Sequence, residues 1–242
     1  MKSATPVIGM IVPPAAGEVP SEAYGVYPEG VRYVARGLAL GKLTIDGYGA
    51  VIDRVEELSR ELHEKEGADA IALMGTSLSF FRGSGFNEEL VRVMKAATGL
   101  PATTMSNGIR DALRAVGAQR VAVGTAYTDE VNAQLRGFLE VSGFEVLSLE
   151  SLGLVEVPEI HAVTEEQVVA LGERAADRAN GKADAVLISC GGLKSTNLAP
   201  ELEPRVGVPV VASATAGVWA ALRLVGINPA TATLGALGRV AA

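Results

Sequence analysis

The 242-residue chain contains one cysteine, and the residues around it suit it to chemistry. Cys190 comes directly after the apolar run "AVLIS" and is followed by Gly191 and Gly192. A thiol that faces a cleft can give or take a proton or attack carbon. Free cysteine is also among the most often buried residue types, so a packing role is the alternative. The position at a strand end, next to two glycines, favours the reactive thiol.

A second turn of small residues, Gly75-Thr76-Ser77, follows the apolar run "AIALM". Successive backbone N–H groups in such turns bind carboxylates or phosphates, and the two hydroxyls add donors. Capping of the next helix is the alternative role for Thr76 and Ser77. Tyr127, after "VAVGTA", is either a further donor or a core aromatic. Two such turns on one cleft would favour anion binding.

The other candidates for chemistry are weaker. His63 lies in the charged segment "RVEELSRELHEKEG", which is typical of a solvated helix face. His161 follows an apolar loop, and a catalytic role is possible there but not favoured. Two histidines far apart have no metal-ligand spacing, and "FRGSGFNEE" matches no phosphate-loop pattern. We therefore expect neither a metal nor a cofactor.

Composition excludes several classes of partner. With 21 Lys+Arg against 28 Asp+Glu the net charge is −7, and no basic run suggests nucleic-acid binding. No apolar run reaches the roughly 20 residues that span a bilayer. The start of the chain, "MKSATPVIGMIVPP", lacks the apolar core and cleavage site of a signal peptide. A cytoplasmic protein without a membrane partner is expected.

Short apolar runs alternate with longer amphipathic stretches, as in α/β proteins with buried parallel strands. Strands are predicted at 7–12, 70–74, 102–104, 121–123, 145–147, 185–189 and 208–212. Between the strands predicted at 145–147 and 185–189 lies "TEEQVVALGERAADRANG", which begins with the capping box Thr164 to Gln167. The pattern predicts a doubly wound, mostly parallel α/β fold.

The two halves of the chain repeat each other. "GADAIALMGTSL" aligns with "KADAVLISCGGL", which pairs Asp69 with Asp184 and Gly75 with Cys190. "TGLPATTMSNGIRDALRAVG" aligns with "VGVPVVASATAGVWAALRLVG" with one inserted residue. The strand openings "VIGMIVPP" and "VAVGTAY" also match. We predict two Rossmann-like halves related by a pseudo-twofold: residues 1–116 with 215–242, and residues 117–214.

This arrangement predicts where a site forms. Ligands of open α/β sheets bind beyond the carboxyl ends of the strands. Two facing halves would therefore bring the turns after strands 70–74 and 185–189 to opposite walls of one cleft. The loops after the opening strands would join them, including Pro13, Pro14, Thr125 and Tyr127.

These residues together resemble the aspartate/glutamate racemase superfamily. The matching motifs span nearly the whole chain in order: "GMIVPPAAG", "GLALGKLTIDGYGAVI", "LMGTSLSFFRG", "ATGLPATTMS", "TAYTDEVN", "SCGGL" and "GVPVVASATAGVW". Within the superfamily the chain is most similar to the decarboxylases of arylmalonates. Racemases of this superfamily carry two facing cysteines, one per half, whereas here Gly75 stands opposite Cys190. A single thiol cannot complete a two-base racemisation, which favours the decarboxylases.

The resemblance implies cofactor-free decarboxylation of 2-aryl-2-methylmalonate-type diacids to optically pure 2-arylcarboxylates. Loss of CO2 leaves an enediolate whose charge needs preorganised donors. By similarity these are Thr76, Ser77 and Tyr127, with backbone N–H groups near Gly191 and Gly192, and Cys190 protonates one face. By the same resemblance the leaving carboxylate sits in an apolar pocket lined by Pro13, Pro14, Leu40, Leu43, Tyr48, Val157 and Ile160.

Two other functions stay open at this point. A racemase or cis–trans isomerase of small dicarboxylates, such as a maleate isomerase, would use the same cleft. A non-catalytic protein that binds small anions would keep the donor turns but not need the thiol. Because the pseudo-dimer already completes the cleft, we expect a monomer whose only partner is a small dicarboxylate.

Overall fold

The computed structural model describes residues 5–240, and it contains two four-stranded, fully parallel sheets. The first has the strand order β2-β1-β3-β4 and the second the order β6-β5-β7-β8. The strands are β1 Val7–Val12, β2 Arg32–Gly37, β3 Ala70–Leu73, β4 Ala102–Thr104, β5 Arg120–Thr125, β6 Glu145–Ser151, β7 Ala185–Ser189 and β8 Val210–Ala212. The predicted α/β class and the pairing of two similar halves are thus confirmed. Residues 1–4 and 241–242, which belong to the predicted half 1–116 with 215–242, lie outside the described residues.

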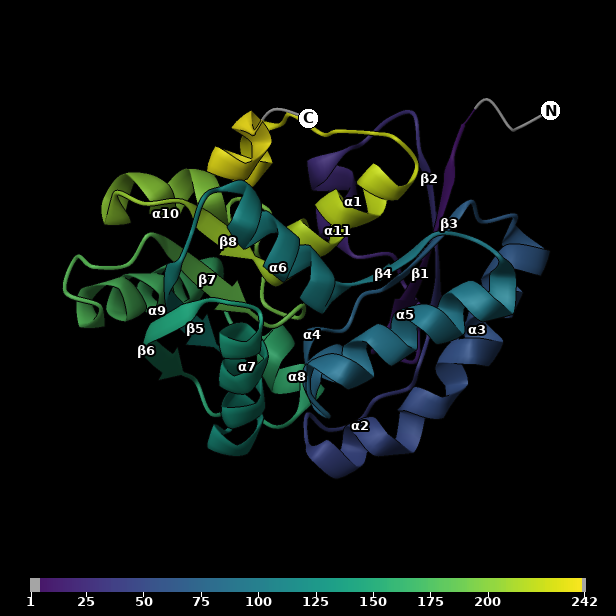
Figure 1. The fold of residues 1–242 in the computed structure, drawn as a ribbon, viewed down its shortest axis with the longest axis horizontal. Helices are drawn as coiled ribbons and strands as arrows, with labels where there is room; N and C mark the ends of the chain where they lie inside the picture. Colours follow the sequence, from purple (N-terminus) through teal and green to yellow (C-terminus); the bar gives the residue numbers. More distant parts are fainter. Residues whose placement is uncertain (1–4, 241–242) are drawn as a thin grey trace.

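Helices cover both sheets (Figure 1). They are α1 Ser21–Val26, α2 Ile45–Val51, α3 Val55–Glu66, α4 Thr76–Phe80, α5 Ser84–Thr98, α6 Met105–Ala115, α7 Asp129–Val141, α8 Val157–His161, α9 Glu165–Arg178, α10 Leu198–Val206 and α11 Ser213–Leu224, with 3-10 segments at Ile52–Arg54 and Ala232–Arg239. The predicted capping box begins α9: the Thr164 hydroxyl accepts from Gln167 N, and the Gln167 amide accepts from Thr164 N. No helix within residues 5–240 is long and apolar enough to cross a membrane.

The repeat is visible in hydrogen bonds. The Asp69 carboxylate accepts from Val7 N at 2.9 Å, at the start of β1. The Asp184 carboxylate accepts from Arg120 N at 2.9 Å, at the start of β5. Each aspartate therefore ties the beginning of the first strand of its half to the beginning of the third.

One part of the predicted alignment is wrong by a residue. In the sheets Ile8 pairs with Ala70, and Val121 pairs with the equivalent Ala185. Ile8, not Val7, therefore corresponds to Val121. The first run is apolar throughout, so it holds no counterpart of the polar Thr125 and Tyr127 that would mark the register. The correct register makes Pro14 the counterpart of Tyr127.

Strand β2 was not predicted, because "RYVARG" has no apolar run. It is an edge strand whose two arginines face Glu66: the Arg36 guanidinium lies 2.7 Å from that carboxylate and the Arg32 guanidinium 3.4 Å. Strands β1, β3, β7 and β8 are buried along their whole length, as continuous apolar strands should be.

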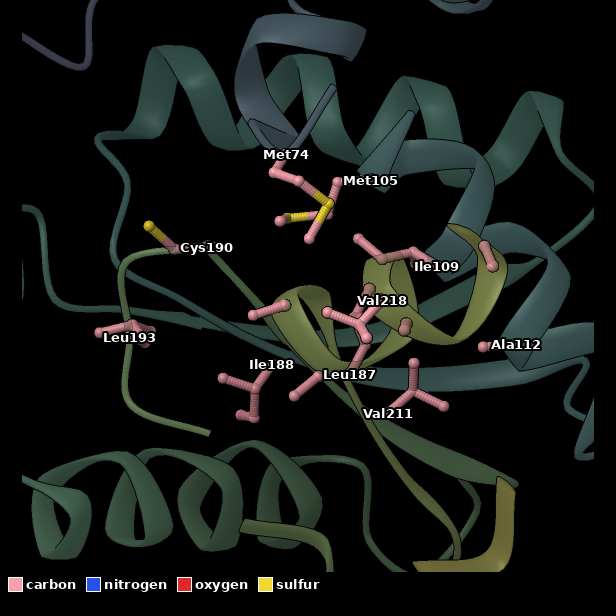
Figure 2. Packing of buried hydrophobic residues seen from close by; sticks show 14 of the residues in the cluster. Met74, Met105, Ile109, Ala112, Leu187, Ile188, Cys190, Leu193, Val211 and Val218 are labelled. Carbon is pink, nitrogen blue, oxygen red and sulfur yellow. The ribbon is translucent and has the colours of Figure 1, made fainter. Parts of the chain in front are cut away.

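The two halves meet along α6 and α11, the equivalent helices that follow β4 and β8 (Figure 1). They cross closely at Gly108, where a Cβ atom would lie 2.7 Å from the Ala216 carbonyl oxygen and 3.0 Å from Gly217 Cα. Met74 and Met105 lie together beside this crossing, near Ile109 of α6 and Val218 of α11 (Figure 2). The carboxyl ends of both sheets are thereby held toward each other.

Candidate active site

A cavity of about 390 Å³ lies at the carboxyl ends of the strands, with walls from both halves. It is lined by the predicted residues Pro13, Pro14, Leu40, Leu43, Gly75, Thr76, Ser77, Tyr127, Val157, Ile160, Cys190, Gly191 and Gly192. The turn after β3 and the turn after β7 therefore reach one space. A Cβ atom at Gly191 would lie 3.7 Å from the Met74 carbonyl oxygen, which shows how closely the two turns approach.

Cys190 is the only free thiol, and its side chain is 6% exposed. It stands at the start of the loop that follows β7, whose last residue is Ser189 (Figure 2). Burial raises the pKa of the thiol to about 11, although the N–H groups of Gly192 and Leu193 and the Tyr127 hydroxyl favour its anion. At neutral pH Cys190 is therefore a protonated thiol. After it loses its proton, these donors stabilise the thiolate.

The hydroxyls of Thr76 and Ser77 belong to α4, which begins after Gly75 without a side-chain cap. The capping alternative is therefore wrong for this helix. The Thr76 hydroxyl donates to the Met105 sulfur at 2.8 Å. Ser77 is 6% exposed, and both Thr76 and Ser77 line the cavity.

Tyr127 lines the same cavity although its side chain is fully buried. Its ring packs edge-on against Phe80, with centroids 5.9 Å apart, and its hydroxyl lies 3.5 Å from Ser189 Oγ. Burial raises the pKa of Tyr127 well above its ordinary value, so the phenol stays a hydrogen-bond donor. Thr125 does not reach the cavity, contrary to prediction, but accepts a hydrogen bond from Tyr127 N at 3.3 Å.

Tyr48 is the one residue of the predicted apolar pocket that does not line the cavity. Its ring is fully buried against Phe81, at 5.3 Å between centroids. Burial raises the pKa of its phenol, and an interaction with Ser77 opposes that shift. Tyr48 thus lies behind the wall formed by Ser77, because the α2 helix that carries it packs its ring inward.

The sequence pattern did not single out several further lining residues: Val12, Glu18, Val19, Pro20, Ser21, Glu22, Met74, Leu193 and Lys194. Most of them adjoin predicted positions. Glu18 to Glu22 continue the loop that holds Pro13 and Pro14, and this continuity was the available signal. The weaker candidate His161 also lines the cavity. It lies beside Gly192, where a Cβ atom would be 3.4 Å from its Nε2.

Comparison with known proteins decides the family. The model of the arylmalonate decarboxylase family matches residues 8–238. The chain belongs to that family. Arylmalonate decarboxylase of Bordetella bronchiseptica is 47% identical over 225 residues, which cover 93% of this chain and 92% of that protein. The arylmalonate decarboxylases are carboxy-lyases, and this chain is an enzyme of that class.

Solved structures agree with the family assignment. A liganded double mutant of arylmalonate decarboxylase superposes with a TM-score of 0.93 at 45% identity, covering 96% of this chain and 98% of that one. The maleate isomerase of Pseudomonas putida S16 has a TM-score of 0.86 at 20% identity, with coverage of 98% and 100%, and shares the fold. The arylmalonate decarboxylase fold is thus built on the same paired halves as a wider group of enzymes.

Proposed function

We propose that the protein decarboxylates arylmalonates without a cofactor and protonates the intermediate through Cys190. The observation that carries this proposal is the single thiol in a cavity where Gly75 occupies the symmetry-equivalent position. In the first step the bond between the α-carbon and one carboxylate breaks, and its electron pair enters the remaining carboxylate as an enediolate. In the second the Cys190 S–H proton passes to the α-carbon, and solvent returns a proton to the thiolate.

The donors around the retained carboxylate support the first step. Thr76, Ser77 and Tyr127, which carry hydroxyls, line the cavity together with Gly191 and Gly192, whose backbone N–H groups are further donors. The Thr76 hydroxyl would turn from the Met105 sulfur to the substrate. These groups are held by the fold before the charge forms, so stabilising the enediolate needs little reorganisation.

The apolar side of the cavity supports loss of CO2. Leu40, Leu43, Val157 and Ile160 line it, and a carboxylate there would be poorly solvated, which favours neutral CO2. The space beside Glu18 to Glu22 is left for the aryl group, which spreads the carbanion charge. Tyr48 supports this wall from behind. The cytoplasmic location expected from the sequence is part of the same proposal.

The test is CO2 release from phenylmalonate and 2-methyl-2-phenylmalonate by EDTA-treated protein. We expect turnover and one product enantiomer. Cys190→Ser should lower kcat about 100- to 10,000-fold, the range of general acid catalysis, while binding of phenylacetate is retained. Cys190→Ala has neither the thiol nor the serine hydroxyl, so it shows whether any activity left in Cys190→Ser comes from that hydroxyl. No CO2 from several arylmalonates would refute the decarboxylase, and full activity of Cys190→Ser would refute the proton donor.

The same assays test the two rivals. Fumarate formed from maleate, or deuterium exchanged into the α-position of amino acids, would favour an isomerase or racemase. Stabilisation by dicarboxylates in a thermal-shift assay without any turnover would favour an anion-binding protein. The absence of a second thiol weighs against the first rival, and membership of a carboxy-lyase family weighs against the second.

A further inference from the structure

Glu22 places a buried carboxyl group between the two halves of the molecule. It belongs to α1, it is 6% exposed, and it lines the cavity, yet the proposed mechanism gives its carboxyl group no chemical role. Its Oε1 accepts hydrogen bonds from Ser195 N at 3.2 Å and from Ser195 Oγ at 3.3 Å. Its Oε2 accepts from Ser21 Oγ at 3.3 Å. A buried carboxyl with three donors around it is built to hold something in place.

The group it holds is the loop that carries the thiol. This loop runs from Cys190 to Asn197 and has two internal turns: Leu193 N donates to Cys190 O and Leu198 N donates to Ser195 O, both at 3.2 Å. Among the described residues outside this loop, Glu22 is the one side chain seen to hydrogen-bond to residues 191–197. The end of the loop remote from β7 is therefore fixed through this carboxyl.

Close packing holds α1 itself against the same loop. A Cβ atom at Gly25 would lie 2.6 Å from Thr196 Cγ2. The Thr233 hydroxyl donates to the Gly25 carbonyl oxygen at 3.0 Å from the other side. Because α1 cannot recede from the loop without breaking these contacts, the carboxyl of Glu22 has a defined place.

We propose that Glu22 is a positioning residue: acting through Ser195, it holds the Cys190 loop so that the thiol meets only one face of the intermediate. The inference rests on the proposed function. When the loop is free to move, the thiol leaves its place for part of the time, and water then protonates either face. Optical purity should therefore fall together with kcat, while KM changes little because the α4 hydroxyls still bind the substrate.

The test compares Glu22→Ala with Glu22→Gln, whose amide oxygen can still accept from Ser195. With 2-methyl-2-phenylmalonate we expect Glu22→Ala to lose kcat about tenfold, to keep KM within about twofold and to give product of lower enantiomeric excess. Glu22→Gln should lose less than about threefold and keep the optical purity. Ser195→Ala, which retains the backbone donor, should fall between them and serves if Glu22→Ala does not fold.

Glu203→Ala is the matched control. The Glu203 carboxylate also accepts from two backbone N–H groups, Val210 at 3.1 Å and Ala236 at 2.8 Å, but it does not line the cavity. This variant should lose thermal stability without losing optical purity. If Glu203→Ala lowers optical purity as much as Glu22→Ala at a similar loss of Tm, Glu22 is merely structural and the proposal is wrong.

Alkylation of the single thiol by iodoacetamide tests the positioning independently of turnover. We expect Glu22→Ala to react about tenfold faster than the unmodified protein, because the loosened loop exposes Cys190, with Glu22→Gln and Glu203→Ala near the starting rate. Equal rates in all four proteins would overturn the proposal. If the unmodified protein releases no CO2, the proposed function fails, and the alkylation rates still decide whether Glu22 holds the loop.

Discussion

At the scale of the residue, the environment of Cys190 favours an acid over a nucleophile. Nucleophilic cysteines have lowered pKa values and partial exposure, whereas burial raises the pKa of this thiol to about 11. The surrounding N–H groups and the Tyr127 phenol would stabilise the thiolate only after proton transfer. The thiol lines the cavity, and its raised pKa keeps it protonated at neutral pH, which supports the proposed acid.

The first prediction concerns the pH dependence of the free enzyme. Because the pKa is raised, the active thiol form persists at alkaline pH and is lost only as the pH rises toward about 11. We expect that kcat/KM for phenylmalonate does not fall through deprotonation of the Cys190 thiol below about pH 10. It is measured from CO2 release in buffers of constant ionic strength. A decline centred near pH 8, matched by the pH dependence of Cys190 alkylation, would contradict it.

The second prediction adds the missing thiol. Gly75→Cys should create racemisation of 2-arylpropionates, because a thiol would then face each side of the α-carbon. A Cβ atom there lies 2.6 Å from Leu78 Cδ1 and 3.2 Å from Leu78 Cβ, and Leu78 is fully buried, so the leucine must move. A loss of about 1–3 kcal/mol in the free energy of unfolding is expected from this overpacking.

Gly75→Ala is the control, since it introduces the same clash without a thiol. Chiral chromatography of enantiopure 2-phenylpropionate after long incubation gives the readout, and urea unfolding gives the stability. Retained optical purity with folded Gly75→Cys protein would show that two thiols at these positions are not sufficient.

At the scale of the element, the crossing of α6 and α11 sets how closely the two halves approach. The Pro101–Pro209 match found in the sequence is correct, because Ala102 of β4 pairs with Ile71 of β3 and Val210 of β8 pairs with the equivalent Val186 of β7. The helices that follow end alike: Gly117 N and Gly226 N each donate to the carbonyl three residues earlier, at 3.0 and 3.1 Å. Local patterns of Pro and Gly were therefore enough to identify this pair of helices.

The third prediction is made at this crossing. Gly108→Ala should lower the free energy of unfolding by about 2 kcal/mol or more, because its Cβ would meet backbone atoms 2.7 and 3.0 Å away. Gly137→Ala on α7 is the control: it is exposed, and its Cβ meets nothing within 4 Å. Better helix propensity should stabilise that variant by about 0.5–1 kcal/mol. Urea unfolding measures both, and equal effects would refute the close-crossing explanation.

At the scale of the whole molecule, one chain supplies both walls of the cavity. Beyond the pair formed by Glu22 and Ser195, the halves meet where Leu43 N donates to Val155 O at 2.9 Å and where Lys42 Nζ lies 3.2 Å from Glu156 Oε1. Leu43 and Val157 line the cavity beside these contacts. No second copy is needed to complete the site.

The fourth prediction follows from this completeness. The protein should sediment as a monomer of 25.0 kDa. Its specific activity should stay constant between about 10 nM and 10 µM, since mass action would otherwise lower it on dilution. Analytical ultracentrifugation and a dilution series of CO2 release provide the measurement. A dimer whose activity falls on dilution would show that contacts between copies support the cavity.

The sequence alone determined the class of fold, the repeat and most of the site, because each depends on local patterns. Apolar strands followed by small-residue turns must place those turns at one sheet edge, and the lone Cys190 opposite Gly75 is readable from two aligned motifs. Only the tertiary structure decided which residues of β1 and β5 are equivalent, that β2 is an edge strand, and that Glu22 contacts Ser195. These depend on pairings between remote segments, 173 residues apart in the last case, and such pairings leave no periodic signal in either segment.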